Sequence, residues 1–196
     1  MAHLQQLIDV SNTLKEYNLK NLIETGTGGG ETLSFVRLLD LDLIQSCEIE
    51  KIQFNKLKEW FTDSNIKLWN GSSTTMLRSM MNELNAPALI FLDAHFPGAG
   101  YLRTEFKTKL YSIQDTLPLE QELKLISEWE YAKNSVIVVD DLRIYKAGNY
   151  EGGDWPEREE LFGQLDYNFL YSTLEDTHIV IEKTIHQGAL IYLPKN

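Results

Sequence analysis

Short apolar segments alternate with amphipathic segments along most of this 196-residue chain. Residues 88–93 and 135–140 are apolar at almost every position, which indicates strands of a sheet that is covered on both faces. Strands that alternate with helices imply crossover connections and therefore parallel neighbours. Residues 178–183 and 189–193 are separated only by a short turn, so we expect these last two strands to pair antiparallel.

The spacing of apolar residues predicts the other elements of the chain. Three further strands are expected at residues 21–25, 43–48 and 66–69. Helices are expected at residues 4–17, 31–39, about 52–60, 73–84, 118–131 and 156–164. We predict an α/β fold in one domain, residues 1–196, built as a three-layer sandwich around a seven-stranded, mostly parallel sheet with a C-terminal antiparallel hairpin.

The composition argues against several classes of partner. A formal net charge of −11 is unfavourable for a nucleic-acid substrate, because DNA- and RNA-binding proteins need a basic face. The single cysteine, Cys47, cannot form an internal disulfide. No apolar segment approaches the roughly 20 residues that cross a bilayer, and no secretory signal is apparent. We therefore expect a cytoplasmic protein that binds a small neutral or cationic ligand, and neither nucleic acid nor membrane.

A glycine-rich turn follows the first expected strand and precedes a helix, with the sequence Glu-Thr-Gly-Thr-Gly-Gly-Gly starting at Glu24. Glycines let the backbone adopt positive φ and approach a ligand closely, and the amides that start the helix then face that ligand. A P-loop is excluded because no lysine follows the glycines. The dinucleotide fingerprint would need glycine where Glu31 stands. The pattern acidic-x-G-x-G-x-G is matched in full by Glu24, Gly26, Gly28 and Gly30.

This pattern resembles the first motif of class I S-adenosylmethionine-dependent methyltransferases, and the resemblance in strand order and terminal hairpin covers essentially the whole chain. It implies a Rossmann-like fold in which Glu24 lies near the methionine part of S-adenosylmethionine. The turn would pass under the cofactor, and the resemblance assigns cofactor contacts to Glu24, Thr25, Gly26, Gly28 and Gly30. The simpler interpretation is a glycine-rich turn that binds no ligand.

An acidic residue ends the second expected strand, where a carboxylate can accept hydrogen bonds from both hydroxyls of a ribose. Glu48 stands at this position, and Glu50 could substitute if the register differs. The family resemblance favours Glu48, although either residue could simply cap the next helix. After the third strand, the resemblance assigns an adenine contact to Ser72, which could equally serve as a helix cap.

Carboxylates also end the two most apolar strands. Asp93 ends the fourth strand, and Asp140 and Asp141 end the fifth. Because the carboxyl ends of parallel strands line one crevice, we expect these three side chains to converge. Such crowding raises carboxylate pKa values unless a cation relieves it, and hard oxygen ligands of this kind suit Mg²⁺.

The surrounding sequence resembles the macrocin-type O-methyltransferases, which act on sugars and sugar-bearing natural products. The resemblance lies in Phe-Leu-Asp-Ala-His ending at His95, Pro-Leu-x-x-Glu-Leu starting at Pro118, and Val-Val-Asp-Asp ending at Asp141. It implies that Asp93, Asp140 and Asp141 hold a divalent metal. His95 departs from the pattern, since that family commonly has another acidic residue nearby. Either Asp93 or His95 could take the proton from the methyl acceptor, so both are candidate catalytic residues.

Two long connections could form the acceptor site. Residues 96–117 and 143–155 both follow strands whose carboxyl ends face the crevice, and long loops in compact domains are usually functional or mobile. Their aromatic and basic side chains would suit a sugar ring, a phosphate or a carboxylate, and the candidates are Tyr101, Arg103, Arg143 and Tyr145. Both connections could equally be variable surface loops.

Together these features predict an S-adenosylmethionine-dependent methyltransferase that methylates a hydroxyl of a sugar, nucleotide-sugar or glycosylated small molecule with the help of Mg²⁺. One alternative is a cofactor-binding or regulatory module of the same fold without catalysis. Others are a nicotinamide-dependent oxidoreductase and an N-methyltransferase acting on a nucleobase or peptide amine. The amino-terminal helix and the apolar hairpin could also pair two copies of the chain into a homodimer.

Overall fold

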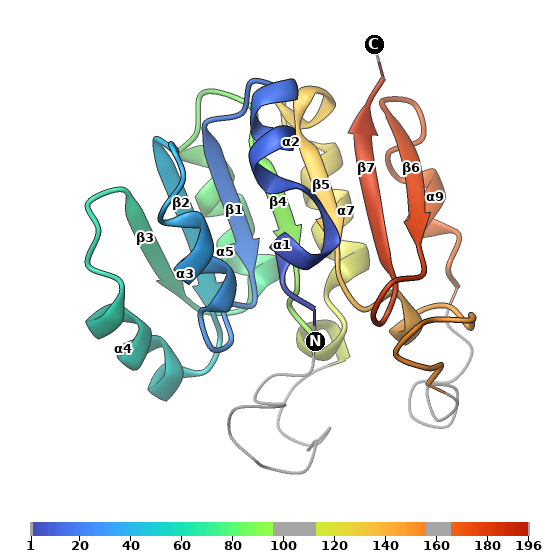
Figure 1. The fold of residues 1–196 in the computed structure, drawn as a ribbon, viewed down its shortest axis with the longest axis horizontal. Coiled ribbons are helices and arrows are strands. Elements are labelled where there is room, and N and C mark those ends of the chain that lie inside the picture. The colour runs from blue at the N-terminus through green and yellow to red at the C-terminus, as the bar shows by residue number, and fades with distance from the viewer. Residues whose placement is uncertain (1, 96–112, 156–165, 196) are drawn as a thin grey trace.

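The computed structural model describes residues 2–95, 113–155 and 166–195. These residues form one seven-stranded sheet with the strand order β3-β2-β1-β4-β5-β7-β6 (Figure 1). The strands are β1 (Asn21–Thr25), β2 (Leu43–Glu48), β3 (Ile66–Asn70), β4 (Leu89–Leu92), β5 (Val136–Val139), β6 (His178–Lys183) and β7 (Ala189–Pro194). Strands β1 to β5 pair in parallel, whereas β7 is antiparallel to both β5 and β6. The predicted sheet and its terminal hairpin are therefore confirmed.

Helices lie on both faces of this sheet. Figure 1 shows α1, α2 and α3 in front of the strands, and α5 and α7 behind them. The α-helices are α1 (Leu4–Leu7), α2 (Val10–Glu16), α3 (Glu31–Val36), α4 (Lys51–Trp60), α5 (Ser73–Asn82), α6 (Ile113–Thr116), α7 (Leu119–Ser127) and α9 (Phe169–Ser172). Short 3₁₀ turns are η1 (Ala132–Asn134) and η2 (Leu142–Ile144). None of the helices in the described ranges has the length and apolarity needed to cross a membrane.

The apolar strands divide their side chains between two cores. In β1, Leu22 joins the core under α1, α2 and α3, while its neighbour Ile23 joins the core under α5 and α7. The same alternation separates Leu89 from Ile90 in β4. Successive side chains of a strand point to opposite faces, so a strand buried on both sides must be apolar at every position. This is the physical reason why the fourth and fifth strands are so hydrophobic.

Helix boundaries differ from the expected ones where a polar side chain competes for the backbone. The expected helix at residues 4–17 is divided into α1 and α2, and Ile8 between them is extended. Asp9 caps α2, since its Oδ1 accepts a hydrogen bond from the N–H of Asn12 at 3.0 Å. Aspartate is strongly favoured at a helix start, so the chain begins a second helix here.

Helix α4 ends at Trp60 as expected, whereas three other helices are confirmed in type but end earlier. Helix α3 ends at Val36, α5 ends at Asn82 and α7 ends at Ser127. Helix α6 lies inside the connection expected at residues 96–117, and the helix expected at residues 156–164 falls outside the described residues. The differences in the ends of α3, α5 and α7 amount to about one helical turn at most and leave the topology unchanged.

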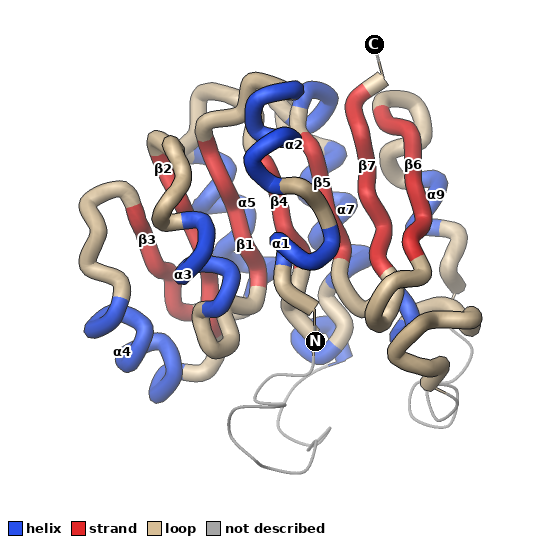
Figure 2. The backbone as a smooth tube through the Cα atoms, viewed as in Figure 1, coloured by secondary structure: helices blue, strands red, loops and turns tan. Residues whose placement is uncertain are grey.

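The strand order reverses direction at β1, which pairs with β2 on one side and with β4 on the other. In an open parallel sheet, ligands bind outside the carboxyl ends of the strands at such a switch point. The loops that follow β1, β2, β3 and β4 leave the strands at the lower edge in Figure 2. The glycine-rich turn and Asp93 both lie at this edge, so the candidate site is to be sought there.

Candidate functional site

The glycine-rich turn connects β1 to α3 and contains three left-handed glycines. The φ angles are 78° at Gly26, 55° at Gly28 and 85° at Gly30, a region that side-chain-bearing residues rarely adopt. A Cβ atom on Gly26 would lie 2.6 Å from the backbone oxygen of Asp93, so the turn packs directly on the end of β4. Among the described residues, the nearest neighbour of a Cβ atom on Gly28 would lie 4.0 Å away, which leaves room at the middle of the turn.

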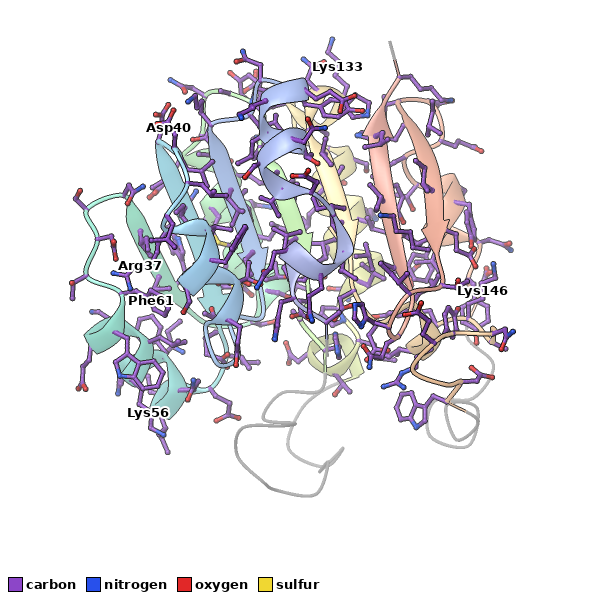
Figure 3. The ribbon with its side chains drawn as sticks, viewed as in Figure 1. Arg37, Asp40, Lys56, Phe61, Lys133 and Lys146 are labelled. Carbon is purple, nitrogen blue, oxygen red and sulfur yellow. The ribbon has the colours of Figure 1, made fainter. Side chains whose placement is uncertain are left out.

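The far end of the turn rests on the aromatic ring of Phe61. A Cβ atom on Gly30 would lie 2.7 Å from Cε2 of Phe61, so a side chain at this position would overlap the phenyl ring. The guanidinium of Arg37 lies 5.3 Å from the centre of the same ring and pairs with Asp63 at 2.7 Å. Figure 3 shows Arg37 and Phe61 beside one another on the α3 and α4 side of the molecule. Packing against Phe61 therefore supports this end of the turn.

Glu48, at the end of β2, contacts the middle of the turn through hydrogen bonds. Its Oε2 accepts from the N–H of Gly28 at 3.0 Å, and its Oε1 accepts from the N–H of Glu50 at 2.7 Å. Gln53 also donates to the carbonyl oxygen of Gly28 at 2.7 Å. Of the two acidic candidates, Glu48 is therefore the one whose carboxylate is directed to the glycine turn.

Glu24 and Thr25 are buried beneath the turn. Glu24 is 1% exposed, and its Oε2 accepts a hydrogen bond from the hydroxyl of Ser46 at 2.5 Å. Burial raises the pKa of Glu24 to about 8, while hydrogen bonds from Ser46 and Thr32 oppose this shift. Thr25 has no exposed surface. The cofactor contacts predicted for Glu24 and Thr25 stay a prediction.

Asp93, His95 and Asp141 form a cluster at the ends of β4 and β5. The Nδ1 atom of His95 lies 3.7 Å from Oδ1 of Asp93, and its Nε2 atom lies 3.7 Å from Oδ2 of Asp141. The imidazole ring is therefore located between two carboxylates, at distances slightly longer than a hydrogen bond. Burial lowers the pKa of His95, an effect that the charge of Asp141 opposes.

The backbone of Asp141 is left-handed, with φ 54° and ψ 52°. A residue with a side chain adopts this conformation at a cost of about 1–3 kcal/mol, and such residues concentrate at functional sites. Here the conformation is supported by Arg143, whose Nε donates to Oδ1 of Asp141 at 2.9 Å. Arg143 lies at the rim of the cluster, and its side chain is 26% exposed.

Asp140 is the most deeply buried member of the group. Neither of its carboxylate oxygens, nor Oδ1 of Asp93, has a hydrogen-bond partner of good geometry among the described residues. Burial, reinforced by the charge of Asp141, raises the pKa of Asp140 to about 7, although nearby backbone N–H groups of Asp141 and Ala2 oppose this shift. Burial and the charge of Asp140 also raise the pKa of Asp93 well above its ordinary value. These oxygens are suited to accept hydrogen bonds or to contact a cation.

The chemistry of these carboxylates fits a hard divalent ion, but their arrangement is not a ready ligand shell. Within the described ranges, no three His, Cys, Asp or Glu side chains are placed to hold one metal ion. An ion at this position would have to draw Asp93, Asp140 and Asp141 together. His95 lies between Asp93 and Asp141, whereas the joint binding of a metal by Asp93, Asp140 and Asp141 stays a prediction.

Two of the proposed acceptor residues lie outside the described residues, namely Tyr101 and Arg103. A third, Tyr145, is 5% exposed and packs edge-on against Phe169 with ring centres 6.1 Å apart. In this position Tyr145 is part of the protein interior rather than of an open surface. Arg143 is the one member of the four that the described structure leaves at the rim of the crevice.

Glu122 was not identified from the sequence as a site residue. It is 1% exposed and lies on the buried side of α7 with Leu119, Leu123 and Ile126. Burial raises its pKa to about 7, while the hydroxyls of Ser73 and Thr25 oppose the shift. A lone acidic residue at helical spacing within an apolar stripe is the sequence signal that could have identified it.

Replacing Glu122 with glutamine is expected to remove a pH dependence of stability. The folded-state pKa of about 7 exceeds the ordinary 4.5, so the folded protein binds more protons between these values. The contribution of Glu122 is therefore fully present below pH 4.5 and is lost as the pH rises to 7. The lost stability amounts to about 3 kcal/mol. Urea unfolding of wild type and Glu122→Gln from pH 4.5 to 8 measures the difference, with Glu120→Gln on the exposed side of α7 as control.

Comparisons with known proteins agree on the fold. No protein-family model matches the sequence, and the search of curated proteins finds no match. Among solved structures, the S-adenosylhomocysteine-bound methyltransferase PaMTH1 of Podospora anserina has a TM-score of 0.65 at 17% identity, covering 100% of this chain and 80% of that one. An O-methyltransferase of Bacillus cereus in complex with S-adenosylhomocysteine has a TM-score of 0.58 at 14% identity, covering 100% of this chain and 83% of that one. The chain therefore has the Rossmann-like fold of these methyltransferases.

Proposed function

We propose that this protein is an S-adenosylmethionine-dependent O-methyltransferase that acts on a small molecule. The observation that carries the proposal is the space that the described residues leave at Gly28, in a turn that Glu48 contacts from one side and Asp93 from the other. Two solved structures of similar fold, with 17% and 14% sequence identity to this chain, contain bound S-adenosylhomocysteine, which supports this choice of ligand. The identity of the acceptor as a sugar, nucleotide-sugar or glycoside rests on the macrocin-type resemblance alone.

Glu48 and the glycine turn would hold the cofactor. The carboxylate of Glu48, which accepts from the N–H groups of Gly28 and Glu50, would also accept from ribose hydroxyls. The open middle of the turn lets the cofactor approach the backbone.

The cluster around Asp93 would receive the proton of the acceptor. The acceptor oxygen forms a bond to the methyl carbon, the bond from that carbon to sulfur breaks with its electron pair left on sulfur, and the hydroxyl proton passes to Asp93 or His95. Both side chains are nearly buried, at 14% and 6% exposed, so proton transfer would occur away from bulk water. A base held within reach of a bound hydroxyl is what this displacement needs.

A divalent ion forms a second part of the proposal. Asp93, Asp140 and Asp141 would hold Mg²⁺ through oxygens that include three without hydrogen-bond partners in the described structure. Such an ion supplies a Lewis acid that makes an acceptor hydroxyl more acidic. Addition of MgCl₂ together with S-adenosylhomocysteine should then raise the melting temperature further, and EDTA should reverse the increase. If Mg²⁺ left the melting temperature unchanged, the divalent ion would be removed from the proposal, and methyl transfer would rely on the side chains of the protein alone.

Cofactor binding is tested by thermal unfolding with increasing S-adenosylhomocysteine. A ligand at 100 times its Kd stabilises the folded state by about 2.7 kcal/mol, so the melting temperature of wild type should rise with concentration. Glu48→Gln should weaken binding about 10- to 100-fold, because the amide cannot accept from two backbone N–H groups and two hydroxyls at once. Glu50→Gln is the matched control and should bind within about twofold of wild type.

The same assay distinguishes the other candidate functions. Stabilisation by NADH but not by S-adenosylhomocysteine would support the oxidoreductase and refute the methyltransferase. Stabilisation by S-adenosylhomocysteine without any product from S-adenosylmethionine and a panel of sugars, glycosides and amines would support the module without catalysis. Methylated amines formed without a metal effect would support N-methylation.

A further inference from the structure

A groove of about 890 Å³ crosses the edge of the sheet where β1 and β2 begin. Its walls come from the end of α2, the connection before β4, the 3₁₀ turn η1 and the end of β7. This is the upper edge in Figure 1, where Figure 3 labels Asp40 and Lys133. Strand β1 runs from this edge to the glycine turn, and four steps of about 3.3 Å separate its two ends. The groove is therefore distinct from the candidate cofactor site.

One side chain in the lining of this groove is nearly buried and still has an unused acceptor. Asn21, the first residue of β1, is 8% exposed. Its Nδ2 donates to the carbonyl oxygen of Pro87 at 3.4 Å, which fixes the direction of the amide. Its Oδ1 accepts no hydrogen bond from the described residues. Because buried polar atoms are normally hydrogen-bonded, this oxygen is suited to a donor that enters the groove.

Three further asparagines line the same groove with free amides. Asn18 lies just after α2, Asn85 lies before β4, and Asn134 ends η1. All three are exposed, and none of their side chains is hydrogen-bonded within the described part of the chain. Each amide offers two N–H donors and one carbonyl acceptor. The groove therefore presents both donors and acceptors to a ligand.

The charged side chains of the groove give it no net charge. Two lysines and two acidic residues line it, so their formal charges cancel. Lys20 pairs with Asp40, and Glu83 pairs with Lys67. Both partners lie outside the lining, which directs these charges away from the centre of the groove. A lining of this kind favours an uncharged ligand over an anion such as a phosphate.

The same groove does not match the usual ways in which a protein binds a peptide. An extended peptide would add a strand along the free side of β3 or β6, whereas this groove crosses the ends of the strands. A helical peptide would need an apolar groove for its apolar face, and here four asparagines interrupt the apolar lining. The lining therefore favours a polar, uncharged small molecule over a peptide.

We propose that this groove binds a neutral oligosaccharide. A sugar hydroxyl donates and accepts through one oxygen, and an asparagine amide offers the complement of both. Tyr17 adds an aromatic ring to the lining, whose apolar face can pack on the C–H face of a sugar. The volume of the groove lies within the range of roughly 300–1,000 Å³ that is typical of ligand pockets. The proposal does not depend on the methyltransferase assignment, because the groove and the cofactor site lie at opposite ends of β1.

The test titrates the full chain with maltohexaose, cellohexaose and chitohexaose by isothermal titration calorimetry, with hexagalacturonic acid as the charged comparison. At least one neutral hexasaccharide should bind, and more tightly than the charged one. Asn85→Ala and Asn134→Ala should each weaken binding about 3- to 10-fold, the effect of one lost hydrogen bond. Tyr17→Ala should weaken it about 10-fold, because the sugar loses its aromatic contact. Asn55→Ala, exposed on α4 and outside the lining, should bind within about twofold of wild type.

If none of the neutral hexasaccharides bound at millimolar concentration, the inference would be overturned and the proposed function would stand. Binding that the three groove variants leave unchanged would also overturn it, because the sugar would then bind elsewhere. Displacement of the sugar by S-adenosylhomocysteine has the same meaning, since it would place the sugar at the other edge of the sheet. A protein that binds the sugar but not S-adenosylhomocysteine would refute the proposed function alone. The unfolding midpoint of each variant shows whether it is folded during the titration.

Discussion

Replacing Asp93 with asparagine is expected to lower kcat for methyl transfer by about 100- to 10,000-fold, the usual range for loss of a positioned acid or base. The amide preserves the shape of the side chain but removes its negative charge and its ability to receive a proton. Asp93 lies 3.7 Å from His95, and its Oδ1 has no hydrogen-bond partner in the described structure, so no neighbour replaces the lost function directly. The Kd for S-adenosylhomocysteine should change much less than kcat.

The measurement is the rate of S-adenosylhomocysteine release with an acceptor found in the panel, together with calorimetric binding of the cofactor product. Asp42→Asn is a suitable control, since Asp42 is exposed at the opposite edge of the sheet, before the start of β2. A variant with unchanged kcat would exclude Asp93 from the chemistry. If kcat and cofactor affinity fell by the same factor, Asp93 would be a cofactor-binding residue instead.

Gly26→Ala is expected to destabilise the protein by roughly 2–5 kcal/mol, a large part of the 5–15 kcal/mol by which a typical domain is stable. The new Cβ would lie 2.6 Å from the backbone oxygen of Asp93 and 2.9 Å from the Cα of Ala94. These backbone atoms cannot move aside cheaply, because the N–H of Asp93, just after β4, donates to the carbonyl oxygen of Thr25. The φ of 78° adds the strain of a left-handed alanine. Urea unfolding monitored by circular dichroism gives the change in free energy.

Gly28→Ala is the matched comparison, because it has the same backbone strain without the steric overlap. With its nearest neighbour at 4.0 Å, the new Cβ should cost only about 1–2 kcal/mol in stability. It would, however, occupy the space through which the proposed cofactor approaches the turn, so affinity for S-adenosylhomocysteine should fall. The expectation fails if Gly26→Ala is as stable as Gly28→Ala, or if Gly28→Ala binds the cofactor product like wild type.

The sheet could be predicted from the sequence because its signals are local. Strands β4 and β5 are apolar at every position as a direct result of burial on both faces, and the short turn before β7 leaves only antiparallel pairing. The break between α1 and α2 was missed because the apolar spacing continues through Ile8, while one side chain, that of Asp9, starts the second helix. The spacing of apolar residues does not report the competition of a single polar side chain for the backbone.

The candidate site could be predicted only where strand ends define it. The acidic residues after β2, β4 and β5 follow from topology, since parallel strands end at one edge. The choice between Glu48 and Glu50 could not be made from spacing, because it depends on which carboxylate meets the N–H of Gly28. Glu122 was missed for a related reason. Its burial and its hydrogen bonds involve Ser73 and Thr25, which lie far away in the sequence, and no local pattern reports such contacts.

The position of β7 has a consequence for the order in which the sheet can assemble. Strand β6 precedes β7 in the chain but touches the sheet only through β7, which lies between β5 and β6. During synthesis on the ribosome, β6 therefore has no partner until residues 189–194 have emerged, and the side of β5 that β7 will cover stays open until then. Non-local pairings of this kind form late, because the intervening chain must first be ordered. The unpaired side of β5 is thus the part of the growing chain most in need of protection from aggregation.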